Sequence, residues 1–331
     1  MSYSQGGKID ASDYNNFVGS SPSSTADRIN TVWSVGSGSA GYGQTALSQV
    51  STGSIVTATQ WASLINTLNS IRTHQTGSGS GFTANTSGQK IDFLSNLSTV
   101  VAAAYSSRLA FASNSAVSTS VGGSLSTAWT VTVANPGGNP PAGGSSVTNV
   151  TRAFGVRCAF ASADQARYFF NAGGRLKLNL SGTQNASTTA RTNEIISLLS
   201  FAGGVALFNA NTNSGRTGTG ATVVTNNTTI GYHTATYNSN VTLIDITSTT
   251  TNYTSDKIYV YVNCNGTQGS NNDKGLNVDF WTQIQTYSGG DNGTYSFDDS
   301  FGVNVIRTVD ISWPETTNLS NTWGAVTVTS I

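Results

Sequence analysis

The chain has 331 residues and is almost uncharged: only 9% of its residues are Asp, Glu, Lys or Arg, and its formal net charge is zero. A neutral chain lacks the basic surface that nucleic acid requires, two cysteines cannot build a disulfide framework, and no apolar run reaches the roughly 18 residues of a membrane-spanning helix. We therefore expect no nucleic-acid partner, no membrane insertion and no cofactor, and the opening residues MSYSQGGKID show no secretory-leader pattern.

Small polar residues dominate the composition, since Gly, Ser, Thr and Asn make up about half of the chain. Disordered chains share this feature, but they lack aromatic and β-branched residues and carry a high net charge. This chain contains 37% hydrophobic residues, including 6 Trp, 12 Tyr and 13 Phe, which predicts a mainly β fold with Thr, Ser and Asn on exposed strand faces. Because few charges oppose self-association, we expect the chain to pack against copies of itself or other subunits.

Residues 1–115 have helical periodicity and are predicted to form a small helical attachment module. Helices are expected over 10–18, 25–33, 59–72 and 91–111, and the third has the clearest apolar face. Four aromatic residues of this module are predicted to form its docking surface: Tyr14, Phe17, Trp33 and Trp61. The glycine-rich stretches at 36–43 and 77–81 are interpreted as loops or loose linkers.

Two helix starts in this module resemble each other. Residues 7–14 and 53–61 both run from a glycine through an isoleucine to Ala, Ser or Thr residues, and then to an aromatic residue one turn into a helix. Aligning them needs one residue of offset. Two interpretations stay open: the two helices share the same capping chemistry, or a helical pair is duplicated.

From about residue 119 the periodicity becomes strand-like, and residues 116–331 are predicted to form an antiparallel β-sandwich or jelly-roll-like domain. Strands are expected over 128–133, 150–160, 175–180, 205–209, 221–225, 229–237, 241–247, 257–264, 276–286, 302–313 and 324–329. Two short helices interrupt them, one over 166–172 after a capping box of Ser162 and Gln165, and one over 192–201. Both helices are expected to close the open ends of the sandwich.

Residues suited to catalysis are scarce, since the chain has only His74, His233, Glu194 and Glu315 as its histidines and glutamates. The histidines have no metal-ligand spacing, so structural polar roles are expected for them. The chain has no convincing serine-nucleophile motif and no phosphate-binding glycine loop. The sequence thus predicts that the protein is not an enzyme, and a glycosidase with an unmarked carboxylate pair is the least favoured alternative.

Two further features are candidate sites. Asp291, Asp298 and Asp299 are weak calcium candidates in an Asx-rich loop, but such turns form without a metal, and we expect none. Cys158 and Cys264 both fall on predicted strands, where they either form a disulfide across the sandwich or stay reduced and buried. The reduced state is favoured because the chain shows no leader.

Several stretches together resemble a known family. They are the opening Gly-x-Ile with its helix cap, Val32-Trp33, residues 41–44, residues 50–58 followed by Trp61, His74-Gln75, and above all residues 160–174, FASADQARYFFNAGG. In these stretches the chain resembles virion structural proteins of tailed bacteriophages, especially phages of cyanobacteria and other aquatic bacteria. Relatives of this kind are known mainly as structural, tail or fibre-associated proteins, so the resemblance implies no catalytic residues.

The resemblance implies a place in a phage particle that is assembled in the host cytoplasm. We expect a component of the tail, collar or fibre apparatus that docks to other virion proteins by its helical module. Its β domain is expected to form a closed homo-oligomer such as a trimer. One alternative is a receptor-binding protein whose loops at 263–273 and 287–295 recognise host surface glycan, and another is a capsid decoration protein.

Overall fold

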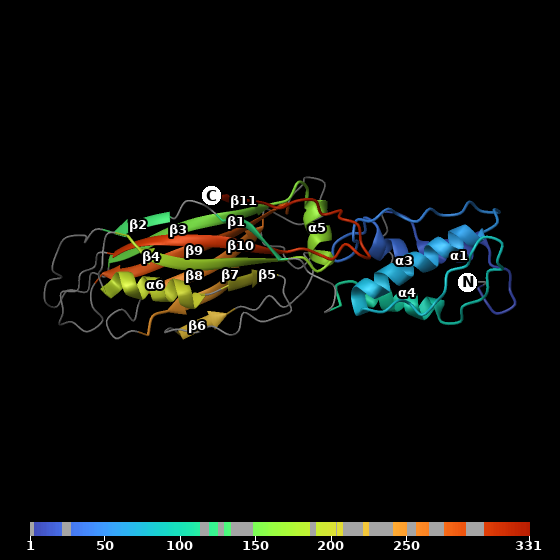
Figure 1. The fold of residues 1–331 in the computed structure, drawn as a ribbon, viewed down its shortest axis with the longest axis horizontal. Helices are drawn as coiled ribbons and strands as arrows, with labels where there is room; N and C mark the ends of the chain where they lie inside the picture. The colour runs from blue at the N-terminus through green and yellow to red at the C-terminus, as the bar shows by residue number, and fades with distance from the viewer. Residues whose placement is uncertain are drawn as a thin grey trace.

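The computed structural model describes residues 3–21, 28–112, 119–124, 129–133, 148–185, 190–202, 204–207, 221–224, 241–249, 256–264, 275–288 and 301–331. For residues 119–124, 129–133, 148–150, 204–207, 221–224 and a few strand ends, the description covers the backbone alone. The described residues form an elongated molecule with a helical part at one end and two antiparallel sheets at the other (Figure 1). The described residues contain comparable amounts of helix and strand.

The helical part contains α1 (Ala11–Val18), α2 (Ile29–Trp33), α3 (Ala58–Thr76) and α4 (Leu97–Ser106). The apolar face of α3 is fully buried and packs toward α2 and α4; it consists of Trp61, Leu64, Ile65, Leu68 and Ile71. The helices predicted over 10–18 and 59–72 are confirmed, and α3 continues for a further turn. The helix predicted over 25–33 is confirmed from residue 29, and residues 22–27 lie outside the described ranges.

The helix predicted over 91–111 is wrong at both ends, because α4 has only 10 residues. Before α4, the backbone N–H of Leu94 donates to the hydroxyl of Tyr3 at 2.7 Å, in a stretch that is not helical. After α4, the backbone N–H of Ala112 donates to the carbonyl of His74 at 2.8 Å. Hydrogen bonds to distant residues therefore hold the flanking chain, and helical periodicity cannot reveal such bonds.

The two similar helix starts adopt the same local structure. Each begins with a glycine at positive φ, Gly6 at 77° and Gly53 at 84°, and each ends in a complete capping box, Asp10 with Asp13 and Thr57 with Gln60. An aromatic residue follows each box and is buried. The matching glycine is thus Gly6 and not Gly7, which removes the one-residue offset. The likeness stops after the first turn, because α1 has 8 residues and α3 has 19.

The β part contains two antiparallel sheets. In the first, the order is β1 (Thr119–Ser124), β10 (Phe301–Ser312), β4 (Arg175–Gln184) and β5 (Gly204–Leu207), and β2 (Trp129–Val133) also pairs with β10. In the second, the order is β11 (Thr327–Ser330), β3 (Thr148–Ala159), β9 (Asn277–Ser288), β8 (Lys257–Cys264), β7 (Val241–Thr247) and β6 (Ala221–Val224). The predicted strands are confirmed within a few residues at their ends, except 229–237, which lies outside the described residues.

The two sheets and a helix share one core. Arg307 on β10 is buried, donates to the carbonyl of Gly155 on β3 at 3.2 Å, and lies 5.7 Å from the ring of Phe154. Helix α6 (Ala190–Ala202) contacts β4 and β10 of one sheet and β7 and β8 of the other. It runs alongside the strands (Figure 1), so its predicted place across an open end is wrong, because its buried residues reach both sheets.

Helix α5 (Ala163–Asn171) lies at the end of the β part that faces the helical part (Figure 1), which fits the predicted position at an open end. Its predicted capping box is only half formed. The hydroxyl of Ser162 accepts from the backbone N–H of Gln165 at 3.1 Å, but Oε1 of Gln165 is buried and has no hydrogen-bond partner within the described residues.

Candidate functional site at the junction of the two parts

Residues 313–326, here called the strap, connect β10 to β11 by way of the helical part (Figure 1). Gln44 binds the backbone of the strap in both directions: its Nε2 donates to the carbonyl of Ser320 at 2.8 Å, and its Oε1 accepts from the Ser320 N–H at 2.9 Å. The hydroxyl of Thr322 donates to the carbonyl of Tyr42 at 2.7 Å. The strap thus joins both sheets to the helical part.

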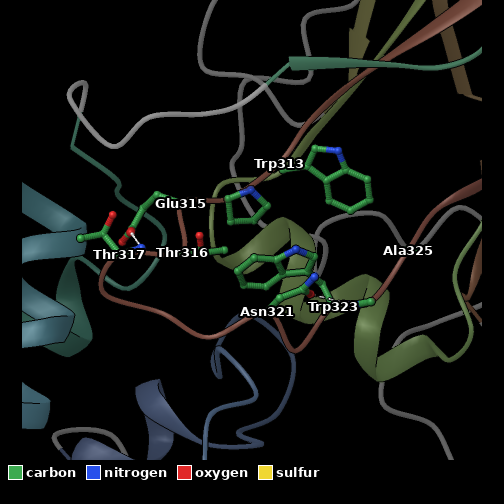
Figure 2. Close-up of a pocket in the computed structure, with 9 residues that line it drawn as sticks. Trp313, Glu315, Thr316, Thr317, Asn321, Trp323 and Ala325 are labelled. Carbon is green, nitrogen blue, oxygen red and sulfur yellow. Dashed lines mark hydrogen bonds between the residues drawn. The ribbon is translucent and has the colours of Figure 1, made fainter.

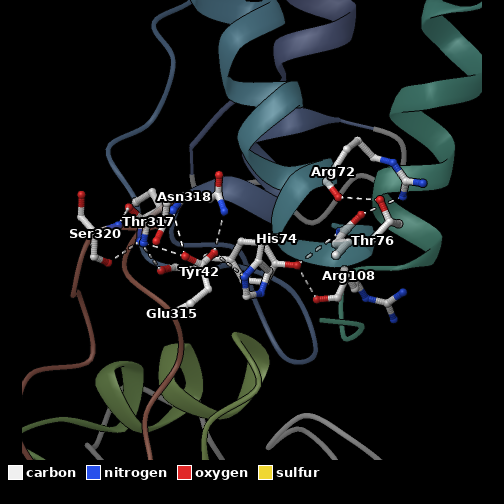
Figure 3. A network of polar contacts seen from close by, with 11 residues as sticks. Tyr42, Arg72, His74, Thr76, Arg108, Glu315, Thr317, Asn318 and Ser320 are labelled. Atoms are coloured by element: carbon white, nitrogen blue, oxygen red, sulfur yellow. Dashed lines mark hydrogen bonds and ion pairs between the residues drawn. The ribbon is translucent and has the colours of Figure 1, made fainter. Parts of the chain in front are cut away.

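A buried hydrogen bond between His74 and Glu315 lies at the centre of this junction (Figure 3). Nδ1 of His74, in the last turn of α3, is 2.9 Å from Oε1 of Glu315 in the strap, and both side chains are buried. Oε2 of Glu315 accepts from the backbone N–H groups of Thr317 at 2.6 Å and Asn318 at 2.9 Å.

Glu315 is ionised in the folded protein. Burial by itself raises the pKa of this carboxyl group, but the hydrogen bonds from His74 and Asn318 outweigh burial and lower the pKa from 4.5 to about 2. A carboxylate can only accept hydrogen bonds, so Nδ1 of His74 carries the proton that lies between the two side chains.

Tyr42 connects this pair to the rest of the helical part. Its ring packs edge-on against the ring of His74, with centroids 5.2 Å apart. Its hydroxyl donates to the carbonyl of Arg108 at 2.7 Å and accepts from Nε2 of Gln75 at 3.2 Å. Burial raises the pKa of Tyr42 well above its usual value, and the hydrogen bond from Gln75 offsets only part of this increase. The hydroxyl therefore stays protonated and keeps donating.

Helix α5 packs against the glycine-rich loop at 35–43. Nη1 of Arg167 donates to the carbonyls of Val35 at 2.5 Å and Ala40 at 2.7 Å, and its Nη2 pairs with Asp164 at 2.8 Å. Nδ2 of Asn171 donates to a third carbonyl of the loop at 3.2 Å. The stretch interpreted as a loose linker is therefore a structured binding surface, because its carbonyl groups bind two buried side chains of α5.

Gly43 lets α5 approach this loop closely. Its φ is +71°, and a Cβ added there would overlap the ring of Tyr168 on α5. Residues other than glycine rarely adopt this backbone conformation. Both the conformation and the close ring contact therefore require glycine at position 43.

The strap also lines a cavity of about 400 Å³ (Figure 2), a size common among small-molecule sites. Its apolar lining is Trp313, Pro314, Trp323 and Ala325, and its polar lining includes Thr316, Thr317 and Asn321. Trp313 packs edge-on against Phe169 of α5, with ring centroids 5.5 Å apart. Glu315 also lines the cavity, but its hydrogen bonds to the strap and to His74 already use both of its oxygens.

The predicted docking residues lie mainly in the core of the helical part. Tyr14, Phe17 and Trp61 are each 3% exposed or less, and the rings of Phe17 and Trp61 pack edge-on with centroids 6.5 Å apart. Trp33 is partly buried, and its Nε1 donates to the carbonyl of Thr45 at 2.9 Å. Tyr14, Phe17 and Trp61 thus pack within the helical part, and Trp33 is the one of the four that keeps an exposed portion.

Most of the other predicted sites fall on parts of the chain that are not described. Asp291, Asp298, Asp299 and His233 lie outside the described residues, as do most of the loops 263–273 and 287–295. Within the described ranges, no three His, Cys, Asp or Glu side chains come together as metal ligands would.

The sheet register separates the two cysteines. Cys158 on β3 and Cys264 on β8 both lie opposite Val278, on the two strands that flank β9. Neighbouring strands are about 4.8 Å apart, so the two Cα atoms are about 10 Å apart, beyond the roughly 7 Å limit for a disulfide. This geometry supports the interpretation in which the two cysteines do not pair with each other.

Sequence reasoning missed the junction itself. It expected a structural polar role for His74, but the partner, Glu315, lies 241 residues further along the chain, and it gave no role to Arg167. The stretches at 41–44, 74–75 and 160–174, which are expected above to resemble virion proteins, supply Gln44, His74 and Arg167 to the junction.

Comparison with known proteins identifies no relative of this chain. No protein-family model, no curated protein and no solved structure matches this chain. Among the helices of the described ranges, none combines the length and the apolar character needed to cross a bilayer. The functional interpretation of the junction therefore starts from its own hydrogen bonds and packing, and not from a relative.

Proposed function

We propose that this chain is a structural component of a phage virion and not an enzyme, built as a rigid connector in the tail, collar or fibre apparatus. In this proposal the helical part docks to other virion proteins, and the two sheets form a β-sandwich that self-associates as a homo-oligomer. The observation that carries the proposal is the junction, where Gln44, Arg167 and Asn171 bind main-chain groups of a distant part of the chain. Side chains used in this way fix two parts relative to each other.

Two further observations support the proposal. The stretches that resemble phage virion proteins coincide with the contacts of the junction, and the sequence is only 9% charged, which suits permanent contact with other protein surfaces. The buried Arg307, which reaches from β10 to β3, supports the sandwich arrangement of the two sheets.

The test is to locate the chain in virus particles produced from the genome that encodes it. Quantitative mass spectrometry of purified particles should detect the chain at a copy number that matches a symmetric assembly. A map of the particle should show the helical part against a neighbouring protein, and light scattering of the purified chain should give an oligomer. The same map distinguishes the alternatives, a receptor-binding tip protein and a capsid decoration protein, because they occupy different positions.

Two results together would contradict the proposal: absence of the chain from purified particles, and a stable monomer at micromolar concentration. Presence in the particle with a monomer in solution would retain the virion role and reject only the self-association.

A further inference from the structure

The outward face of the sheet around β8 and β9 carries a row of aromatic side chains. Along β8, Ile258, Val260 and Val262 are buried, whereas the alternate residues Tyr259 and Tyr261 are only partly buried. Alternation of this kind places the two tyrosines on the face away from the core. Trp281, directly opposite Tyr261 on β9, belongs to the same face.

The rings of Tyr261 and Trp281 stack in nearly parallel planes. Their planes differ by only 14°, and their centroids are 6.4 Å apart. Parallel rings whose centroids are about 4.5–7 Å apart are offset from each other, so each ring leaves part of its face uncovered by the other. Burial raises the pKa of Tyr261, so its hydroxyl stays protonated in neutral solution.

Gly155 provides the space for this arrangement. It lies opposite Trp281 on β3, and a Cβ at this position would be 3.2 Å from Cδ2 of Trp281 and 2.5 Å from Cγ1 of Ile331. The indole therefore leans over the strand where a side chain is missing. A glycine inside a strand often marks a place where another group approaches the backbone closely.

Amide side chains border the aromatic row. Gln283 lies opposite Tyr259, and Gln285 lies opposite Lys257, both on the outward face of β9. Each amide offers two N–H donors and one acceptor oxygen. The face thus combines aromatic rings with neutral groups that can both donate and accept hydrogen bonds.

The charges on this face balance one another. Arg157 and Asp279 form a two-pronged ion pair, with N–O distances of 2.8 and 2.7 Å. Of the other described residues on this face, Lys257 and Asp245 are charged; they have opposite signs and flank Tyr259, with Asp245 directly opposite it on β7. A face without net charge is complementary to an uncharged ligand.

The area of the row argues against a second copy of the chain as its occupant. A large aromatic side chain buries about 150–250 Å² when it is fully covered, and the rings of Tyr259, Tyr261 and Trp281 are already partly buried. The three together offer well below the roughly 800 Å² per partner that a stable protein interface needs.

We propose that Tyr261 and Trp281, bordered by Tyr259, Gln283 and Gln285, bind a neutral saccharide chain. The apolar C–H face of a sugar ring packs on an aromatic ring, and its hydroxyl groups hydrogen-bond to the amides at the border. The two offset, nearly parallel rings offer apolar contacts to successive sugar units of an extended chain. This binding site does not depend on where the chain sits in a particle.

The test is electrophoresis of the full chain in native gels that contain dextran, galactomannan or hydroxyethylcellulose, with alginate as a charged polymer. At least one neutral polymer should retard the protein, and alginate should not. Calorimetry with the retarding polymer should then show binding at least tenfold weaker for Trp281→Ala and for Tyr261→Ala. Trp281→Phe, which keeps a ring, should bind more tightly than Trp281→Ala.

Tyr105→Ala is the matched control, because Tyr105 is a partly exposed aromatic residue on α4, in the helical part. It should change binding by less than twofold, and circular dichroism should show that all variants are folded. The proposal is overturned if no neutral polymer retards the protein, if only alginate does, or if Trp281→Ala and Tyr261→Ala bind as the unaltered chain does. It is also overturned if Trp281→Ala abolishes oligomers without any polymer binding, since the face would then be a protein interface.

Discussion

Glu315 accepts hydrogen bonds both from the helical part and from within the strap. Its two oxygens accept from His74, from two backbone N–H groups of the strap and from Nδ2 of Asn318 at 3.2 Å. A buried carboxylate is costly unless it is paired and hydrogen-bonded. These partners satisfy that condition, so the same residue orders the strap and attaches it to α3.

The lowered pKa of Glu315 predicts how stability depends on pH. Because the pKa is about 2 in the folded protein and 4.5 ordinarily, the ionised group stabilises the folded state above pH 4.5, and this contribution is lost as the pH falls toward 2. The difference corresponds to roughly 3 kcal/mol. Urea unfolding of Glu315→Gln between pH 2 and 6 should therefore show a weaker pH dependence than the unaltered chain.

Asp92→Asn is the control for this measurement, because Asp92 is an exposed carboxylate of the helical part. It should keep the pH dependence of the unaltered chain. Equal pH dependence in Glu315→Gln and Asp92→Asn would show that the hydrogen bonds of Glu315 contribute nothing to acid stability.

At the level of elements, the contact between α5 and the loop at 35–43 depends on how closely the two backbones approach. Gly43 and Gly53 both have positive φ, but only Gly43 faces a side chain of another element; Gly53 has open space around it. Replacing either by Ala costs roughly 1–2 kcal/mol for the backbone conformation. Gly43→Ala should lose a further 1–3 kcal/mol, approximately, through overlap with Tyr168.

The free energies of unfolding of Gly43→Ala and Gly53→Ala, measured in urea, test this expectation. The difference between the two free energies measures the overlap of residue 43 with Tyr168, because both variants have the same cost for the backbone conformation. Equal destabilisation of the two variants would mean that α5 moves away from the loop at little cost.

Elements with strong local signals were predictable from the sequence. The bounds of β7 and β8 match the prediction, α1 and α3 begin at capping residues, and α5 ends before a glycine at positive φ. Local periodicity and capping depend only on neighbouring residues, which explains this success.

Features that depend on distant contacts were not predictable. The ends of α4 are fixed by Tyr3 and His74, α6 lies between two sheets, and Tyr14 and Trp61 are buried by helices that the sequence could not position. The candidate site has the same limitation. Amphipathic spacing identifies a buried face, but it cannot separate a core aromatic residue from one that contacts a partner.

For the whole molecule, the junction predicts that the helical and β parts unfold together. Calorimetry of the unaltered chain should give one transition that coincides with the loss of both helix and strand signals. The double variant Gln44→Ala with Glu315→Ala removes the hydrogen bonds of Gln44 to the strap and the hydrogen bond of Glu315, in the strap, to His74. It should separate the melting of the two parts into two transitions.

Asn69→Ala is the matched control for this prediction, because the Asn69 amide binds Ser80 and Phe82 within the helical part. It should lower the single transition without splitting it. Two transitions in the unaltered chain, or one unchanged transition in the double variant, would contradict coupling through the junction.

The position of the strap in the sequence also has a consequence for synthesis. Gln44 and Ser320 are 276 residues apart, so a growing chain exposes Gln44, His74 and the loop for α5 long before the ribosome has made their last partners. Bringing such distant segments together is slow. A chain that terminates before residue 313 lacks the strap altogether and therefore cannot form the hydrogen bonds that join Gln44 and His74 to it.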